Sequence, residues 1–101
     1  MSRTQISTLV NTTQTVTAQV NYITYANGQQ IIKLTHVNIN NTICNHCWLY
    51  NSNLATNFKF KKSQINKQIT FTATIDTYYK VRDNKKVLDY CLTKVDNIQF
   101  I

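Results

Sequence analysis

The stretch Ile69-Thr70-Phe71-Thr72-Ala73-Thr74-Ile75-Asp76 decides the fold of this chain. Its apolar residues fall on every second position, and Thr or Asp occupies the positions between them. Alternation with a period of two, in residues that favour strands, indicates a β-strand with one face in a core and the other toward solvent. We therefore expect residues 69–76 to form a strand with Phe71, Ala73 and Ile75 in the core.

The same period appears in four further segments. Residues 12–25 alternate with Val20 on the core face, and their apolar phase shifts near Ile23, which indicates a bulge or a bend. Asn27-Gly28 follows and predicts a tight hairpin turn. The remaining expected strands are residues 30–40, 43–50 and 87–93, with Leu34 and Leu92 in the core and a charged loop at residues 80–86.

The order of these segments predicts the architecture. Three strands in a meander, a polar connector and a final hairpin indicate an all-β fold, a small five-stranded OB-fold-like Greek-key barrel. An SH3-like barrel is the alternative. A chain of 101 residues forms one domain, which we expect to span residues 12–101, with residues 1–11 as a polar N-terminal arm.

Uncharged polar residues dominate the composition, and they bound the possible functions. Thr, Asn and Gln number 15, 13 and 8 of the 101 residues, and Thr favours strands while Asn disfavours helices. With one Gly and no Pro, the chain cannot form a glycine-rich phosphate loop. The net charge of +7 favours a polyanionic partner, and four acidic residues supply few groups for catalysis. We therefore expect a binding protein without catalytic residues rather than an enzyme.

The three cysteines give expectations about metals and location. Cys44 and Cys47 lie three apart in an expected strand, and residues at that spacing point to opposite faces. We therefore expect no shared metal ion and no cofactor, with Trp48 and Tyr50 on the face of Cys44. An odd number of cysteines fits reduced thiols in the cytoplasm. Because the chain has neither a long apolar run nor a secretory leader, we expect a cytoplasmic protein away from membranes.

Basic and aromatic residues gather around the 69–76 strand. Eight of the eleven cations fall within residues 59–86, and lysines beside aromatic rings suit an unpaired nucleic-acid strand. We expect these cations to lie on a common side of the barrel. The expected nucleic-acid contacts are Lys59, Lys61, Lys62, Lys67, Lys80, Arg82, Lys85 and Lys86. The expected stacking or partner-contact residues are Trp48, Tyr50, Tyr78 and Tyr79, with a core position for Trp48 as an open alternative.

Three motifs resemble those of a known family. Asn45-His46-Cys47-Trp48-Leu49 is similar to the Asp-His-Val-Trp-Leu signature of small bacterial and phage-type OB-fold proteins of mobile elements. Residues 69–78 resemble the pattern Ile-x-Phe-x-Ala-x-Val-x-x-Tyr, and Asp89-Tyr90-Cys91-Leu92 resembles Asp-Tyr-x-Leu. Asn45 and Asn66 depart from the usual Asp and Gly. Within that family, the chain is similar in character to the small partners encoded beside an A-family DNA polymerase in staphylococcal cassette chromosome elements.

The resemblance implies a mobile-element DNA replication accessory protein that joins a polymerase or primase complex and binds single-stranded nucleic acid weakly. Its expected partners are a DNA polymerase or other replication protein encoded nearby and single-stranded nucleic acid, with no membrane. Two alternatives stay open. One is a protein–protein interaction module without nucleic-acid contact. The other is a mobile-element inhibitor of a nucleic-acid enzyme, although a net charge of +7 counts against mimicry of DNA.

Overall fold

Five antiparallel strands make up the sheet of this protein, in a computed structural model that describes residues 7–101 and, at Asn45, the backbone alone. The strands are β1 (Thr13–Ala26), β2 (Gln29–Ile39), β3 (Thr42–Tyr50), β4 (Gln68–Arg82) and β5 (Lys85–Phe100). Two single-turn 3-10 helices, η1 (Asn51–Asn53) and η2 (Lys62–Gln64), lie in the connector between β3 and β4. Within residues 7–101, no helix has the length and apolarity needed to cross a membrane.

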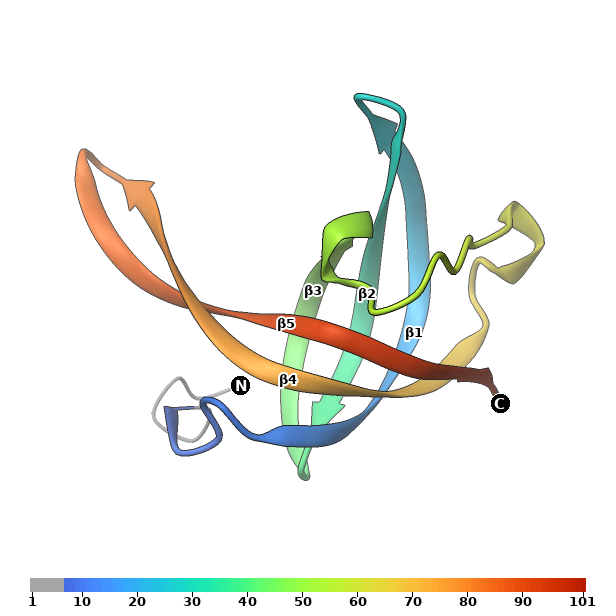
Figure 1. The fold of residues 1–101 in the computed structure, drawn as a ribbon, viewed down its shortest axis with the longest axis horizontal. Coiled ribbons are helices and arrows are strands. Elements are labelled where there is room, and N and C mark those ends of the chain that lie inside the picture. The colour runs from blue at the N-terminus through green and yellow to red at the C-terminus, as the bar shows by residue number, and fades with distance from the viewer. Residues whose placement is uncertain (1–6) are drawn as a thin grey trace.

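The strand order β3-β2-β1-β4-β5 puts β1 at the centre of the sheet. In Figure 1, β1, β2 and β3 rise side by side, while β4 and β5 sweep across them and curve upward into a hairpin. No ladder joins the two outer strands in the described chain. Instead Leu54, just beyond β3, forms a parallel bridge with Val95, whose carbonyl accepts the Ala55 N–H at 2.8 Å. The all-β class is confirmed, whereas the sheet remains open rather than closing into a barrel.

The core follows the alternation expected from the sequence. Phe71, Ala73 and Ile75 are each at most 1% exposed, and the Thr residues between them are half-buried. The core positions expected elsewhere, Val20, Leu34 and Leu92, are also buried, so all six assignments are confirmed.

Asn supplies the turn conformations that Gly provides in most proteins. The three hairpin turns are Asn27-Gly28, Asn40-Asn41 and Asp83-Asn84, and both residues of each have a positive φ. Two successive positive φ values characterise the type I′ turn, whose twist matches that of the strands it joins. Asn and Asp adopt this region at a lower cost than other residues with side chains.

Bulges give the sheet its curvature. The ladder between β1 and β2 shifts register near Val20, as the phase shift in the sequence predicted, and again opposite His36, which has a φ of 51°. The ladder between β4 and β5 shifts twice, at Lys94 and Asn97, which also have positive φ values. Each bulge adds a residue to one strand and increases its bend, so β5 curls across the sheet.

The charged loop expected at residues 80–86 is wrong, because β4 continues to Arg82 and β5 begins at Lys85. Asp83-Asn84 alone forms the turn. The sequence pattern did not indicate strands here, because charged side chains replace the apolar alternation near the tip. Both faces of the two strands are exposed there.

A buried amide ties the connector to the sheet. Gln30 is 5% exposed, and its Nε2 donates to the Phe60 carbonyl while its Oε1 accepts the Phe60 N–H, both at 2.7 Å. These bonds hold the Phe60 ring in the core, 4.9 Å from the Phe58 ring centroid. At the other end of the chain, Leu9 and Val10 pack against the core, while residues 1–6 of the expected arm lie outside the described residues.

We predict that Gln30→Leu lowers the free energy of unfolding by about 2–4 kcal/mol, because the buried N–H and C=O of Phe60 lose their partners. Equilibrium unfolding in urea measures this loss. Gln29→Leu is the matched control, since Gln29 is exposed and its substitution should change the unfolding free energy by less than about 0.5 kcal/mol. Equal losses in the two variants would contradict the role assigned to the Gln30 amide.

Candidate nucleic-acid interface

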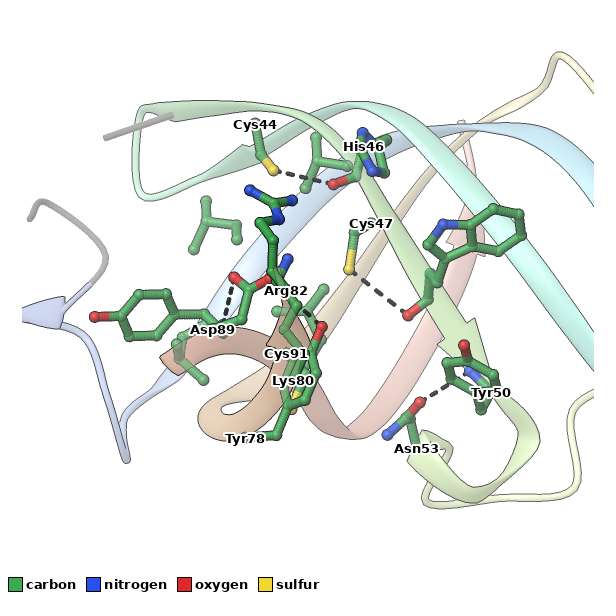
Figure 2. A pocket seen from close by; sticks show the side chains of 16 residues that line it. Cys44, His46, Cys47, Tyr50, Asn53, Tyr78, Lys80, Arg82, Asp89 and Cys91 are labelled. Carbon is green, nitrogen blue, oxygen red and sulfur yellow. Dashed lines mark hydrogen bonds and ion pairs between the residues drawn. The ribbon is translucent and has the colours of Figure 1, made fainter. Parts of the chain in front are cut away.

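A groove of about 850 Å³ lies between β3 and the β4–β5 hairpin. Figure 2 looks into this groove, with Cys44 and Cys47 of β3 on one side and Tyr78 and Asp89 of the hairpin on the other. Because β3 and β5 are the two outer strands, the groove is the opening that is left where the sheet does not close.

The β3 side of the groove carries exposed aromatic rings at its rim. Leu49 is buried and Cys47 packs against the core, so Trp48 and Tyr50, which alternate with them, point to the opposite face of the strand. Trp48 is 37% exposed and Tyr50 48% exposed, and both border the groove. A core position for Trp48 is therefore excluded, and its ring is accessible to a ligand.

A cation orients the Trp48 ring. Lys33 of β2 is the cross-strand neighbour of Trp48, and its Nζ lies 5.8 Å from the ring centroid. On the other side of Lys33, the cross-strand neighbour is Tyr22 of β1, which is 51% exposed. This row of Tyr22, Lys33 and Trp48 combines two rings with a positive charge on the outer face of the sheet, and a cation–π contact favours a fixed indole orientation.

Cys44 and Cys47 lie on the same side of β3, so the expectation that they face opposite ways is wrong. Cys44 is paired with Val37 and Cys47 with Leu34, and both of these partners are fully buried. The bulge at His36 adds a residue to β2, which brings Leu34 and Val37 to the same face although they are three positions apart. Because β3 pairs with β2 through this region, its two cysteines follow.

Three cysteines line the groove, and the thiols of Cys44 and Cys47 donate hydrogen bonds there. In Figure 2 the side chains of Cys44 and Cys47 point from β3 into the groove, and Cys91 lies across from them on β5. The Cys44 thiol donates to the His46 carbonyl at 3.1 Å, and the Cys47 thiol donates to the Trp48 carbonyl at 3.8 Å. All three cysteines are free thiols.

Burial makes two of these thiols weaker acids than an ordinary cysteine. Burial, and then the nearby Cys44, Cys91 and Asp89, raises the pKa of the Cys47 thiol to about 12. Burial, followed by Asp76 and Asp89, also raises the pKa of Cys91. Since the thiolate is the form that attacks electrophiles and binds metals, these cysteines are unreactive near neutral pH. Within the described residues, no group of three His, Cys, Asp or Glu side chains could hold a metal ion.

Asp89 organises the hairpin side of the groove. Its Oδ2 pairs with the Lys80 Nζ at 2.5 Å and accepts a long hydrogen bond from the Tyr78 hydroxyl at 3.5 Å. Burial, and then the Asp89 carboxylate, raises the pKa of Tyr78. Lys80, expected to contact nucleic acid, is thus paired within the protein, whereas Arg82 and Lys85 are exposed beside the turn.

The two basic clusters lie apart, so their expected common side is wrong. The connector cluster is formed by Lys59, Lys61, Lys62 and Lys67. The hairpin cluster is formed by Arg82, Lys85 and Lys86. Figure 1 shows the connector at the right of the molecule and the hairpin tip at the far left. The 15 residues of β4 separate them, and a strand advances by about 3.3 Å per residue.

The side chains of Tyr78 and Tyr79 point to opposite faces of β4, although both are expected from the sequence to contact the same ligand. Neighbouring residues of a strand point to opposite faces. Tyr78 lines the groove, while Tyr79 does not and is 71% exposed.

Sequence reasoning missed Lys33 and Asp89. Lys33 and Trp48 are equally far from the Asn40-Asn41 turn, so a two-residue turn at that position already makes them cross-strand neighbours. Counting from a two-residue turn does not locate Asp89, because the charged residues around Asp83-Asn84 predict a loop rather than two strand ends. The signal for Asp89 was therefore present in the sequence and was obscured by the position of the strand ends.

Comparison with known proteins assigns no relative to this geometry. No protein family, curated protein or solved structure matches the chain. Its function is therefore inferred from the side chains described above.

We predict that the Cys47 thiol makes stability fall at alkaline pH. Burial raises the pKa of the folded thiol from its ordinary value of 9.0 to about 12. Below the lower value both states are protonated. Between the two values the unfolded chain has lost a proton that the folded chain keeps, so the free energy of unfolding falls by about 1.4 kcal/mol per pH unit. In urea unfolding with a reductant, the native chain should lose this stability relative to Cys47→Val as the pH rises above 9.0.

Leu49→Val is the control for this measurement, because it alters the same side of β3 without removing a titratable group. Its difference from the native chain should be independent of pH. Parallel stability profiles for the native chain and Cys47→Val would contradict the elevated pKa.

Proposed function

We propose that this protein is a non-catalytic, cytoplasmic protein that binds single-stranded nucleic acid across β3 and along the β4–β5 hairpin. One observation carries the proposal: the exposed rings of Trp48 and Tyr50 border a groove that Arg82 also lines, beside Lys85. Rings stack on bases, and cations contact phosphates. The groove thus offers both parts of an unpaired strand a partner on adjoining surfaces.

The order of the strands supports an OB-type sheet. In the OB-fold, a five-stranded and partly open Greek-key barrel, ligands bind on the face of strands 2 and 3 and between the loops 1–2 and 4–5. Here Lys33 and Trp48 lie on β2 and β3, and the hairpin cluster lies at the 4–5 turn. The parallel bridge between Leu54 and Val95 corresponds to the contact that closes such a barrel, reduced to one bridge.

The chemistry of the rim favours a single strand over a duplex. Lys33 lies over the Trp48 ring, and the indole is still partly exposed. That exposed surface is available to stack on a base. Bases within a duplex are stacked on one another and present their edges rather than their faces. Stacking contributes about 1–3 kcal/mol per base and depends little on the base, so we expect weak binding without strong sequence preference.

The biological setting that we propose comes from the sequence resemblance. A replication accessory protein of a mobile element, working with a DNA polymerase or another replication protein encoded nearby, would hold a template strand in this way. The alternative is an interaction module without nucleic-acid contact, and the exposed apolar side chains of the hairpin support it.

We predict that oligothymidylate quenches the fluorescence of Trp48, which is the single tryptophan of the chain. A duplex of the same length should quench it far less, because its bases are already stacked. Tyr50→Ala should weaken binding of the single strand by about 1–3 kcal/mol. Tyr79→Ser, which alters an exposed ring outside the groove, is the control and should leave affinity unchanged. Unchanged fluorescence at saturating oligonucleotide would contradict the stacking role.

We also predict that Arg82 and Lys85 of the hairpin cluster, and not the connector cluster, contact phosphates. Arg82→Gln combined with Lys85→Gln should weaken binding and lower the slope of log affinity against log salt by about 0.7 for each lost contact. Lys61→Gln combined with Lys62→Gln removes the same charge from the connector cluster and should change neither quantity by as much. Equal effects of the two pairs would show that general attraction, rather than the groove, supports binding.

A further inference from the structure

The outer part of the β4–β5 hairpin has two chemically different faces. Tyr79 and Leu88 are directly paired across the hairpin, and Val81 lies two residues beyond Tyr79 on the same side. Tyr79 is 71% exposed, Val81 73% and Leu88 40%. We call Tyr79, Val81 and Leu88 the apolar hairpin face. The opposite face carries Tyr78 and Lys80, which line the groove.

The course of β4 leaves Tyr79 and Val81 exposed to solvent. The ladder between β1 and β4 ends at the pair Thr13–Thr74, so within residues 7–101 the ladder with β5 is the one that β4 forms from Asp76 to Arg82. Figure 1 shows the hairpin projecting to the left beyond the other strands. Surface patches of this kind, in which apolar side chains are contiguous rather than scattered, commonly contact another macromolecule.

The charges around this face determine the kind of partner. Lys86 is paired with Val81 and therefore lies on the same face, and Arg82 and Lys85 flank the turn. Lys86, Arg82 and Lys85 are all exposed, and the tip carries one acidic residue, Asp83. Two copies of the chain that met through this face would bring these cations together, and like charges at an interface cost free energy. An acidic partner would instead be attracted.

We propose that the apolar hairpin face binds a protein whose own apolar contact surface is bordered by Asp or Glu side chains. Tyr79 is the central anchor, because tyrosine supplies a large contact area at a low entropic cost. Val81 and Leu88 extend the contact on either side of it, and Lys86 pairs with the acidic border. This inference does not rest on the proposed nucleic-acid binding, which uses the other face of the same hairpin.

A display library of random peptides tests the proposal, with the purified native chain as the target. Selected peptides should combine apolar residues with Asp or Glu. Synthetic copies should bind the native chain and lose at least about tenfold in affinity for Tyr79→Ser combined with Val81→Ser, as expected for a central aromatic anchor. Lys86→Glu should also weaken them. Tyr22→Ser, which removes an exposed ring from β1, is the control and should bind them as the native chain does.

Three outcomes would overturn the proposal. They are a selection that yields no such peptides, binding that survives the double substitution, and a dimer of the native chain in sedimentation that the double substitution abolishes. Binding to phosphatidylserine vesicles that requires Tyr79 and Val81 would assign the face to a membrane surface instead. Because all substituted side chains are exposed, the variants should keep the unfolding midpoint of the native chain. A peptide that binds while oligothymidylate quenches Trp48 would separate this interface from the groove.

Discussion

β4 pairs with β1 from Gln68 to Thr74, and beyond that point β5 is its one partner strand among residues 7–101. This limited pairing positions the groove and both faces of the β4–β5 hairpin. Because the ladder ends, the hairpin twists away from β3. It then presents one face to the groove and the other to solvent.

The long antiparallel strands depend on turns that a chain with one glycine has to make from other residues. Asn27, Asn40, Asn41 and Asn84 all adopt positive φ values in two-residue turns. The same conformation at Lys94 is a bulge in β5, and it costs more there because a long side chain has no local hydrogen bond to offset the strain. The bends of β5 are therefore maintained by the ladder with β4 and by the core on which the strand packs.

Much of the fold could be predicted from the sequence because its signals are local. The alternation around Phe71 and the Asn27-Gly28 turn act over a few residues, and both predictions are confirmed. The positions of Cys44 and Cys47 could not be predicted by counting along β3, since a bulge at His36 on the neighbouring strand determines them. Strict alternation in β3 therefore fails because β3 keeps a constant register with β2, which is itself bulged against β1.

The candidate site was predictable in its residue types and not in its grouping. Trp48 and Tyr50 are exposed beside the groove, as a binding role requires, but the lysines expected with them divide between two ends of β4. The separation depends on how far β4 runs before it turns. Charged residues on exposed strand ends give little indication of that length, because no buried face enforces an alternation there.

The two faces of the hairpin differ in how their charges are used. On the groove side, Asp89 already neutralises Lys80, so Arg82 and Lys85 beside the turn are the cations that would attract the proposed nucleic-acid strand. On the outer side, Lys86 lies beside exposed apolar side chains, where an acidic group would be partly removed from water on binding. A charge pair in such a place contributes more to partner selection than to affinity, because desolvation offsets most of the attraction. Strand alternation places the side chains proposed for these two tasks on opposite faces, so the two proposed partners would not compete for the same face of the hairpin.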